Sequence, residues 1–70
     1  MKYLIIVEKT NTGFSAYSPD LEGCVATGKT KAEVEKNMKE AIDFHLEGLS
    51  LERQIRPLPR SYPHYVEVTA

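Results

Sequence analysis

The chain has few of the residues from which small proteins build covalent or metal-based supports. Cys24 is its only cysteine, so no disulfide can form within the chain. Cys24 and the two distant histidines, His45 and His64, also lack the spacing of a zinc site. A domain of 70 residues buries only about 60% of the surface of its unfolded chain. We therefore expect no metal and no cofactor, and we expect the domain to gain stability by association.

Long hydrophobic runs are also absent. The longest, residues 4–7, is far shorter than the roughly 20 residues that span a bilayer. The N-terminus lacks the charged start and the cleavage site of a secretion signal, and a lone free thiol fits a reducing compartment. The net charge of −1 gives no general attraction to nucleic acid. These features predict one soluble, cytoplasmic domain over residues 1–70, without a membrane segment.

Three short strands are predicted in the first half of the chain. They cover residues 2–8, 14–18 and 24–28, which are rich in β-branched and aromatic residues and are separated by turn residues. Pro19 ends the second strand because proline cannot donate a hydrogen bond to a sheet. Gly23 lets the next loop turn back. The pattern predicts a three-stranded antiparallel meander.

The first strand is apolar on both faces. Tyr3, Ile5 and Val7 point to one side, and Leu4 and Ile6 point to the other. One helix can cover only one face of such a sheet. Since sizeable exposed apolar patches mark interaction sites, we expect a second copy or another protein at Leu4 and Ile6.

A helix is predicted after Thr30, which forms a Thr-x-x-Glu capping box with Glu33. Its apolar stripe has spacings of three and four residues and consists of Val34, Met38, Ala41, Ile42, His45, Leu46 and Leu49. The prolines at 57 and 59 cannot continue the helix. Phe44 lies off the stripe, where it is either an interface anchor or folded beneath the loop around Leu58.

Residues 62–69 are predicted to form a last strand, which completes an α+β domain with the order β-β-β-α-β. A crossover through a helix usually returns the next strand parallel to an earlier one. We therefore expect this last strand beside the first. The order resembles the first part of an RNase H fold, which would hold two metal ions between clustered carboxylates.

No catalytic group is expected. The only carboxylates that could form such a site are Glu8, Glu40 and Glu67, and Glu40 is predicted to point to solvent, opposite the apolar stripe. Cys24 and His45 could form a thiol–imidazole pair, but no third group that would orient the imidazole is identifiable. Buried apolar cysteine and packed histidine are the more common roles for these residue types.

The chain resembles the HicB antitoxin family. The residues that carry the resemblance lie between about residues 3 and 60 and are Gly13-Phe14, Pro19-Asp20-Leu21-x-Gly23-Cys24, Gly28-x-Thr30, Glu40-Ala41-Ile42 and the proline after the helix. Two positions depart from the family pattern, because Glu22 replaces a common proline and Lys29 a common aspartate. The residues expected to hold the loop and the cap are Pro19, Asp20, Gly23, Gly28, Thr30 and Glu33.

The resemblance implies a partial RNase H-like fold and a role in binding and neutralising a HicA toxin, a small ribonuclease that cleaves mRNA. Many members add a C-terminal DNA-binding module. This chain ends at Ala70, so we expect a short stand-alone domain without direct DNA binding. The preferred function is a toxin-binding homo-oligomer. The alternatives are a small RNase H-like RNA-processing enzyme and a subunit that only self-assembles.

Overall fold

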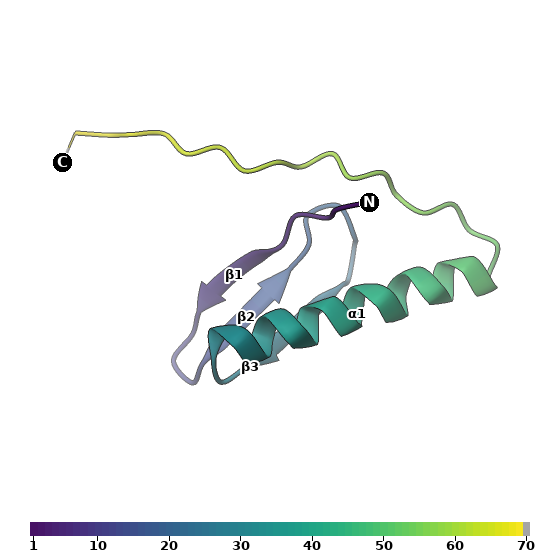
Figure 1. The fold of residues 1–70 in the computed structure, drawn as a ribbon, viewed down its shortest axis with the longest axis horizontal. Helices are drawn as coiled ribbons and strands as arrows, with labels where there is room; N and C mark the ends of the chain where they lie inside the picture. Colours follow the sequence, from purple (N-terminus) through teal and green to yellow (C-terminus); the bar gives the residue numbers. More distant parts are fainter. Residues whose placement is uncertain (70) are drawn as a thin grey trace.

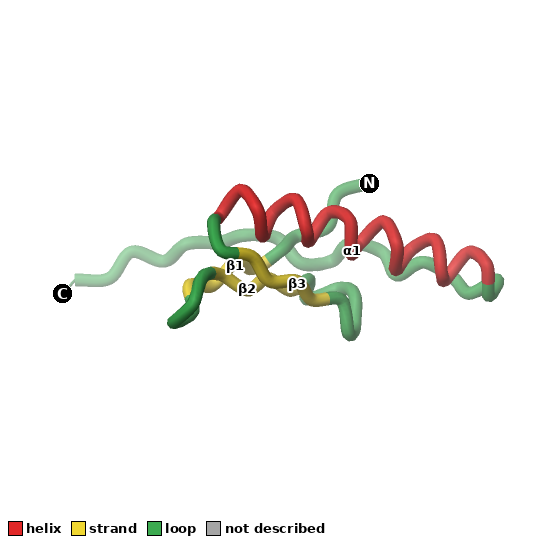
Figure 2. The backbone as a smooth tube through the Cα atoms, turned by 90° about the horizontal axis from the view of Figure 1, so that it is seen from below, coloured by secondary structure: helices red, strands yellow, loops and turns green. Residues whose placement is uncertain are grey.

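The computed structural model describes residues 1–69, which form a three-stranded antiparallel sheet followed by one long helix. The strands are β1 (Ile6–Lys9), β2 (Phe14–Tyr17) and β3 (Val25–Gly28), in the sheet order β1-β2-β3. The helix α1 (Lys31–Leu51) lies across one face of the sheet (Figures 1 and 2). The predicted α+β class, with a meander before the helix, is confirmed. The helix is too polar to cross a membrane.

Two rows of side chains cross the sheet, one on each face, because successive residues of a strand alternate. The row beneath the helix consists of Val7, Ala16 and Ala26. The row on the other face consists of Ile6, Tyr17 and Val25. The helix lies on one face of the sheet (Figure 2). It therefore covers the first row and leaves the second one open, with Tyr17 and Val25 exposed.

The core lies between α1 and the strands. Val34 and Met38 are 0% exposed, and Leu21 from the β2–β3 loop closes the core at 1% exposure. The helix reaches this depth because Gly28 lets its first turn approach the sheet. A Cβ atom at Gly28 would lie 2.6 Å from the backbone nitrogen of Val34.

The helix begins at an N-cap. The Thr30 hydroxyl accepts a hydrogen bond from the Glu33 N–H at 3.0 Å. The Glu33 carboxylate accepts a hydrogen bond from the Lys29 N–H at 3.3 Å. A capping box would use the N–H of the N-cap residue Thr30 instead, so the donor lies one residue earlier than predicted. The first interaction satisfies an N–H group that the first turn leaves without a helical partner, and the second ties the residue before the N-cap to the helix.

The helix ends in a Schellman motif with an arginine at its left-handed position. Arg53 has φ of 58°. Its N–H donates to the Ser50 carbonyl at 3.1 Å, and the Gln54 N–H donates to the Leu49 carbonyl at 2.8 Å. Glycine usually occupies this position, because a left-handed conformation costs other residues about 1–2 kcal/mol.

The predicted last strand is not formed by the single chain. Within the described residues, 62–69 are extended but belong to no sheet, and we call this segment the tail. Residues 62–65 face residues 4–7 across a groove, so their backbone groups do not form a ladder. The first strand is also shorter than the predicted 2–8. One reason is that the Leu4 carbonyl accepts the Ser18 hydroxyl at 2.9 Å instead of a ladder hydrogen bond.

Candidate interaction surfaces

The sheet face that α1 leaves uncovered is one candidate surface. Ile6, Tyr17 and Val25 form its apolar row, and Leu4 precedes Ile6 on the same side. Leu4 and Ile6 are half-buried, whereas Val25 is exposed. We call these four residues the open sheet face. A contiguous apolar surface of this kind is typical of a protein-binding site.

Sequence reasoning found only the β1 half of the open sheet face. Tyr17 and Val25 join Leu4 and Ile6 because the sheet register places them opposite one another. The only sequence signal for Tyr17 and Val25 was the alternation of side chains within their own short strands. This alternation does not show which residues of neighbouring strands lie opposite one another. The structure thus extends the predicted site across all three strands.

A second candidate surface lies on the outer side of the C-terminal half of α1. At about 100° per residue, one stripe gathers three acids and two apolar residues. This acidic helix face consists of Glu40, Asp43, Phe44, Glu47 and Leu51, all of them exposed. Lys39 forms an ion pair with Asp43 at 2.8 Å, and no basic residue lies in the last turn of the helix. The stripe is therefore acidic, with Phe44 and Leu51 along one edge.

Phe44 is the most exposed part of the predicted interface. It is 78% exposed, and Leu58, the residue under which it could have folded, is also exposed. Phe44 lines a groove with Val25 of β3, whereas Leu4 and Ile6 lie at the β1 edge of the sheet. The structure therefore separates the predicted interface residues into two surfaces.

The loop between β2 and β3 holds the start of the C-terminal segment. One Asp20 carboxylate oxygen accepts the backbone N–H groups of Arg60 and Ser61, each at 3.0 Å, and the other accepts the Ser61 hydroxyl at 3.0 Å. The hydrogen bond from the Ser61 N–H is the main reason why the pKa of Asp20 is lowered. Pro19 precedes this carboxylate, and Gly23 turns the loop with φ of 75°. We call the Asp20 contacts the latch.

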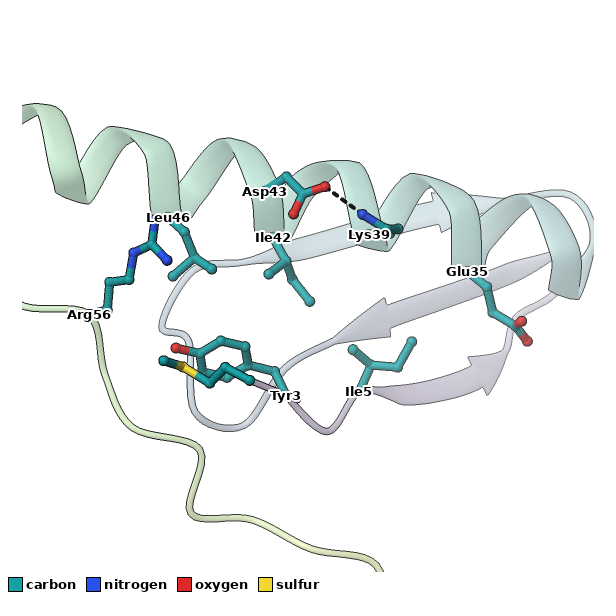
Figure 3. A pocket seen from close by; sticks show the side chains of 9 residues that line it. Tyr3, Ile5, Glu35, Lys39, Ile42, Asp43, Leu46 and Arg56 are labelled. Carbon is teal, nitrogen blue, oxygen red and sulfur yellow. Dashed lines mark hydrogen bonds and ion pairs between the residues drawn. The ribbon is translucent and has the colours of Figure 1, made fainter.

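A shallow groove lies along the free edge of β1, between the N-terminal residues and the helix (Figure 3). Its volume is about 480 Å³. The apolar residues that line it are Met1, Tyr3, Ile5, Ile42 and Leu46. Its charged residues are Glu35, Lys39, Asp43 and Arg56. This edge groove is an apolar surface at the point where the sheet ends.

The structure does not assemble the carboxylates considered for nuclease chemistry. Glu8 lies on β1, on the sheet face opposite the helix, and Glu40 lies on the outer side of α1. Glu67 is exposed in the tail. Among residues 1–69, no group of three potential metal ligands comes together.

Cys24 and His45 line the same groove beside Phe44. Cys24 is buried, and this burial raises the pKa of its thiol. A raised pKa keeps the thiol protonated, which is the opposite of what a nucleophile requires.

Residues 3–68 match the family model of the HicB_like antitoxin of bacterial toxin-antitoxin systems. This match spans nearly the whole chain. The protein belongs to the HicB-like antitoxin family.

Among curated proteins, a 14.9 kDa uncharacterised protein of Haemophilus phage HP1 is 43% identical over 63 residues, covering 90% of this chain and 46% of its own length. A UPF0150 protein of Thermoplasma acidophilum is 38% identical over 71 residues and is covered completely, as is this chain. The chain thus spans about half of the phage relative and the full length of the archaeal one.

Two solved structures share the fold. A chain of the HicA3 and HicB3 toxin-antitoxin complex superposes with a TM-score of 0.76 and 42% identity, covering 89% of this chain and 72% of that one. The crystal structure of the antitoxin HicB3 gives a TM-score of 0.73 and 42% identity, covering 89% of this chain and 46% of that one. Both similarities include the sheet and the helix that carry the candidate surfaces.

Proposed function

We propose that the chain is an antitoxin module that binds and neutralises a HicA-type, mRNA-cleaving toxin. The main support is the similarity to a chain of the HicA3 and HicB3 complex, at 42% identity over 89% of this chain. The RNase H-like alternative lacks comparable support, since no carboxylate cluster forms among the described residues. The alternative of a subunit that only self-assembles does not account for the similarity to a toxin-bound chain.

The acidic helix face is the surface that we assign to the toxin. A ribonuclease needs a basic surface to bind RNA phosphates, and this face offers Glu40 and Glu47 to such a surface, since Lys39 already pairs with Asp43. Phe44 lies beside these acids as an exposed aromatic anchor. By occupying the basic surface, the antitoxin would compete with RNA for it.

The charges should act mainly on the rate of encounter. Complementary potentials speed association more than they slow dissociation. Glu40→Lys and Glu47→Lys are expected to slow association and to reduce its dependence on salt. Glu22→Lys makes the same charge change at an exposed position of the β2–β3 loop and serves as the matched control.

Co-expression tests the assignment. A HicA-type toxin encoded next to this chain should arrest growth alone and should be neutralised when the wild-type chain is co-expressed. Phe44→Asp should lose this protection, because it replaces the aromatic anchor of the contact with a charge. Growth arrest in the presence of abundant, folded wild-type chain would refute the antitoxin function.

As part of the same proposal, the protein is cytoplasmic, associates with itself and has a partial RNase H-like fold. It has no nuclease activity. The net charge of −1 and the separated carboxylates support a protein that neither binds DNA directly nor cleaves RNA. Metal-dependent cleavage of RNA or an RNA–DNA hybrid that is abolished by Glu8→Gln or Glu67→Gln would contradict this part.

A further inference from the structure

The tail has the composition of a strand but lies in solvent. Tyr65 is 92% exposed, and Val66 and Val68 are 74% and 78% exposed. Within the described part of the chain, the tail has no ladder hydrogen bonds, and β1 has no neighbour on its outer edge. An exposed strand edge and an exposed apolar strand are both prone to pair with another chain.

The tail runs beside β1 but forms no backbone hydrogen bonds with it. The latch and a hydrogen bond from the Tyr3 hydroxyl to the Pro57 carbonyl hold the preceding residues. From there the tail runs past the free edge of β1 in the same general direction as β1 (Figure 1) and at about the level of the sheet (Figure 2). A groove of about 410 Å³ separates residues 62–65 from residues 4–7.

We propose that two copies of the chain exchange their tails, so that the tail of each copy enters the groove between β1 and the tail of the other. A twofold axis perpendicular to the tails makes the two tails antiparallel. Because each tail runs parallel to its own β1, the incoming tail is antiparallel to β1 and can pair with it. The order β3-β2-β1-tail-tail-β1-β2-β3 then forms one continuous sheet. This names the segment that carries the self-association proposed above.

The side chains of the tail suit this position. Tyr62, His64, Val66 and Val68 alternate onto one side of an extended chain. That side can cover the edge groove, where Ile5, Ile42 and Leu46 lack a strand to cover them (Figure 3). The apolar residues of one tail can bury on the order of 500 Å². This is more than half of the roughly 800 Å² per partner of a stable interface, and the edge of β1 and the groove walls add to it.

Reciprocity favours a second copy over a foreign strand as the occupant. Each copy has both a free strand and a groove that fits one, so a twofold arrangement pairs both edges of both copies. A strand from a toxin would pair with β1 and the inner side of the tail but would leave the outer side of the tail open. The exchange closes the assembly at two chains.

Sedimentation equilibrium of the full chain tests the proposal. The wild-type chain is expected at twice its 7.9 kDa mass at micromolar concentration. Val66→Asp should weaken the dimer at least a hundredfold, since it buries an unpaired charge, and it should leave the helical circular dichroism unchanged. Leu51→Asp is the control, because Leu51 is 79% exposed but lies outside the tail. A monomeric wild-type chain, or a Val66→Asp variant that stays dimeric, would overturn the proposal.

Cysteine cross-linking tests the antiparallel arrangement of the tails. Tyr65→Cys and Val66→Cys lie near the middle of the tail, where the twofold axis brings the two copies together. At least one of them should form a disulfide-linked dimer on mild oxidation, and Leu51→Cys should not. Cys24 is buried and does not interfere. Equal cross-linking at all three positions would contradict tail exchange.

The co-expression assay keeps this proposal separate from the antitoxin function. Phe44→Asp should lose toxin protection and remain a dimer, whereas Val66→Asp should be a monomer. If the free wild-type chain is a monomer and Val66→Asp loses toxin binding, the groove receives the toxin. That outcome would overturn tail exchange while supporting the antitoxin function.

Discussion

Replacing Gly28 with alanine tests how the helix is seated on the sheet. The added Cβ would lie 2.6 Å from the Val34 nitrogen, 2.9 Å from the Val34 Cα and 3.0 Å from the Glu33 carbonyl carbon. All three atoms belong to the helix backbone, so no side-chain rotation relieves the overlap. The first turn of α1 must move outward, and Val34 must leave a position in which it is fully buried.

The expected cost combines two opposing effects. Overpacking of a well-packed site typically costs about 1–3 kcal/mol. Alanine in place of glycine recovers about 0.4–1 kcal/mol, because the unfolded chain loses conformational freedom. The net loss is about 1–2 kcal/mol, a large share of the roughly 3–5 kcal/mol that a domain of this size can offer. We expect a melting temperature lower by about 5–15 °C.

Gly48→Ala is the matched control for this prediction. Gly48 lies in the last turn of α1, and its added Cβ would meet no atom within 4 Å. The same chemical change should therefore stabilise the protein by about 0.5–1 kcal/mol through helix propensity. Thermal unfolding followed at 222 nm measures both variants. If Gly28→Ala were as stable as wild type, the close contact between β3 and α1 would be wrong.

Three further changes test local features of the fold. Thr30→Ala removes the hydroxyl that accepts the Glu33 N–H and should cost about 1 kcal/mol of unfolding free energy; an unchanged melting temperature would mean that the helix starts elsewhere. Arg53→Gly should stabilise the protein by about 0.5–1 kcal/mol in denaturant titration, because glycine adopts the φ of 58° without strain; destabilisation would argue against the Schellman motif. The pKa of Asp20 is lowered by its latch contacts, so the latch should be fully formed above the ordinary value of 3.8 and should open as the pH falls through the lowered pKa. Amide exchange of Ser61 against pH measures this, and Asp20→Asn should remove the pH dependence.

The meander and the helix could be predicted because their signals are local. Pro19 and Gly23 end and turn the chain through their own backbone restrictions. Thr30 and Glu33 cap the helix within one turn. Each of these signals lies in a stretch of a few residues.

The tail could not be predicted in the same way. Its alternation of tyrosine and valine is typical of a strand, but a strand also needs a neighbouring edge at hydrogen-bonding distance. The sequence pattern does not say which edge is available. In the structure the latch at Asp20 holds the chain beside β1 but outside the sheet.

Only part of the candidate surfaces could be predicted, because the rest depends on how distant segments lie relative to one another. Leu4 and Ile6 were identifiable because β1 is apolar on both faces. Tyr17 and Val25 join them only through register, which depends on three strands at once. Phe44 was identifiable as an aromatic residue off the apolar stripe. Whether the loop around Leu58 covers Phe44 could be decided only from the structure, in which both residues are exposed.

The central claim is that this chain neutralises a HicA-type toxin by covering its RNA-binding surface. The most direct measurement is cleavage of mRNA by the purified toxin encoded beside this chain, titrated with the wild-type chain. We predict that cleavage stops once the chain is stoichiometric with the toxin, and that excess RNA slows the formation of the complex. Continued cleavage at saturating amounts of folded chain would contradict the account.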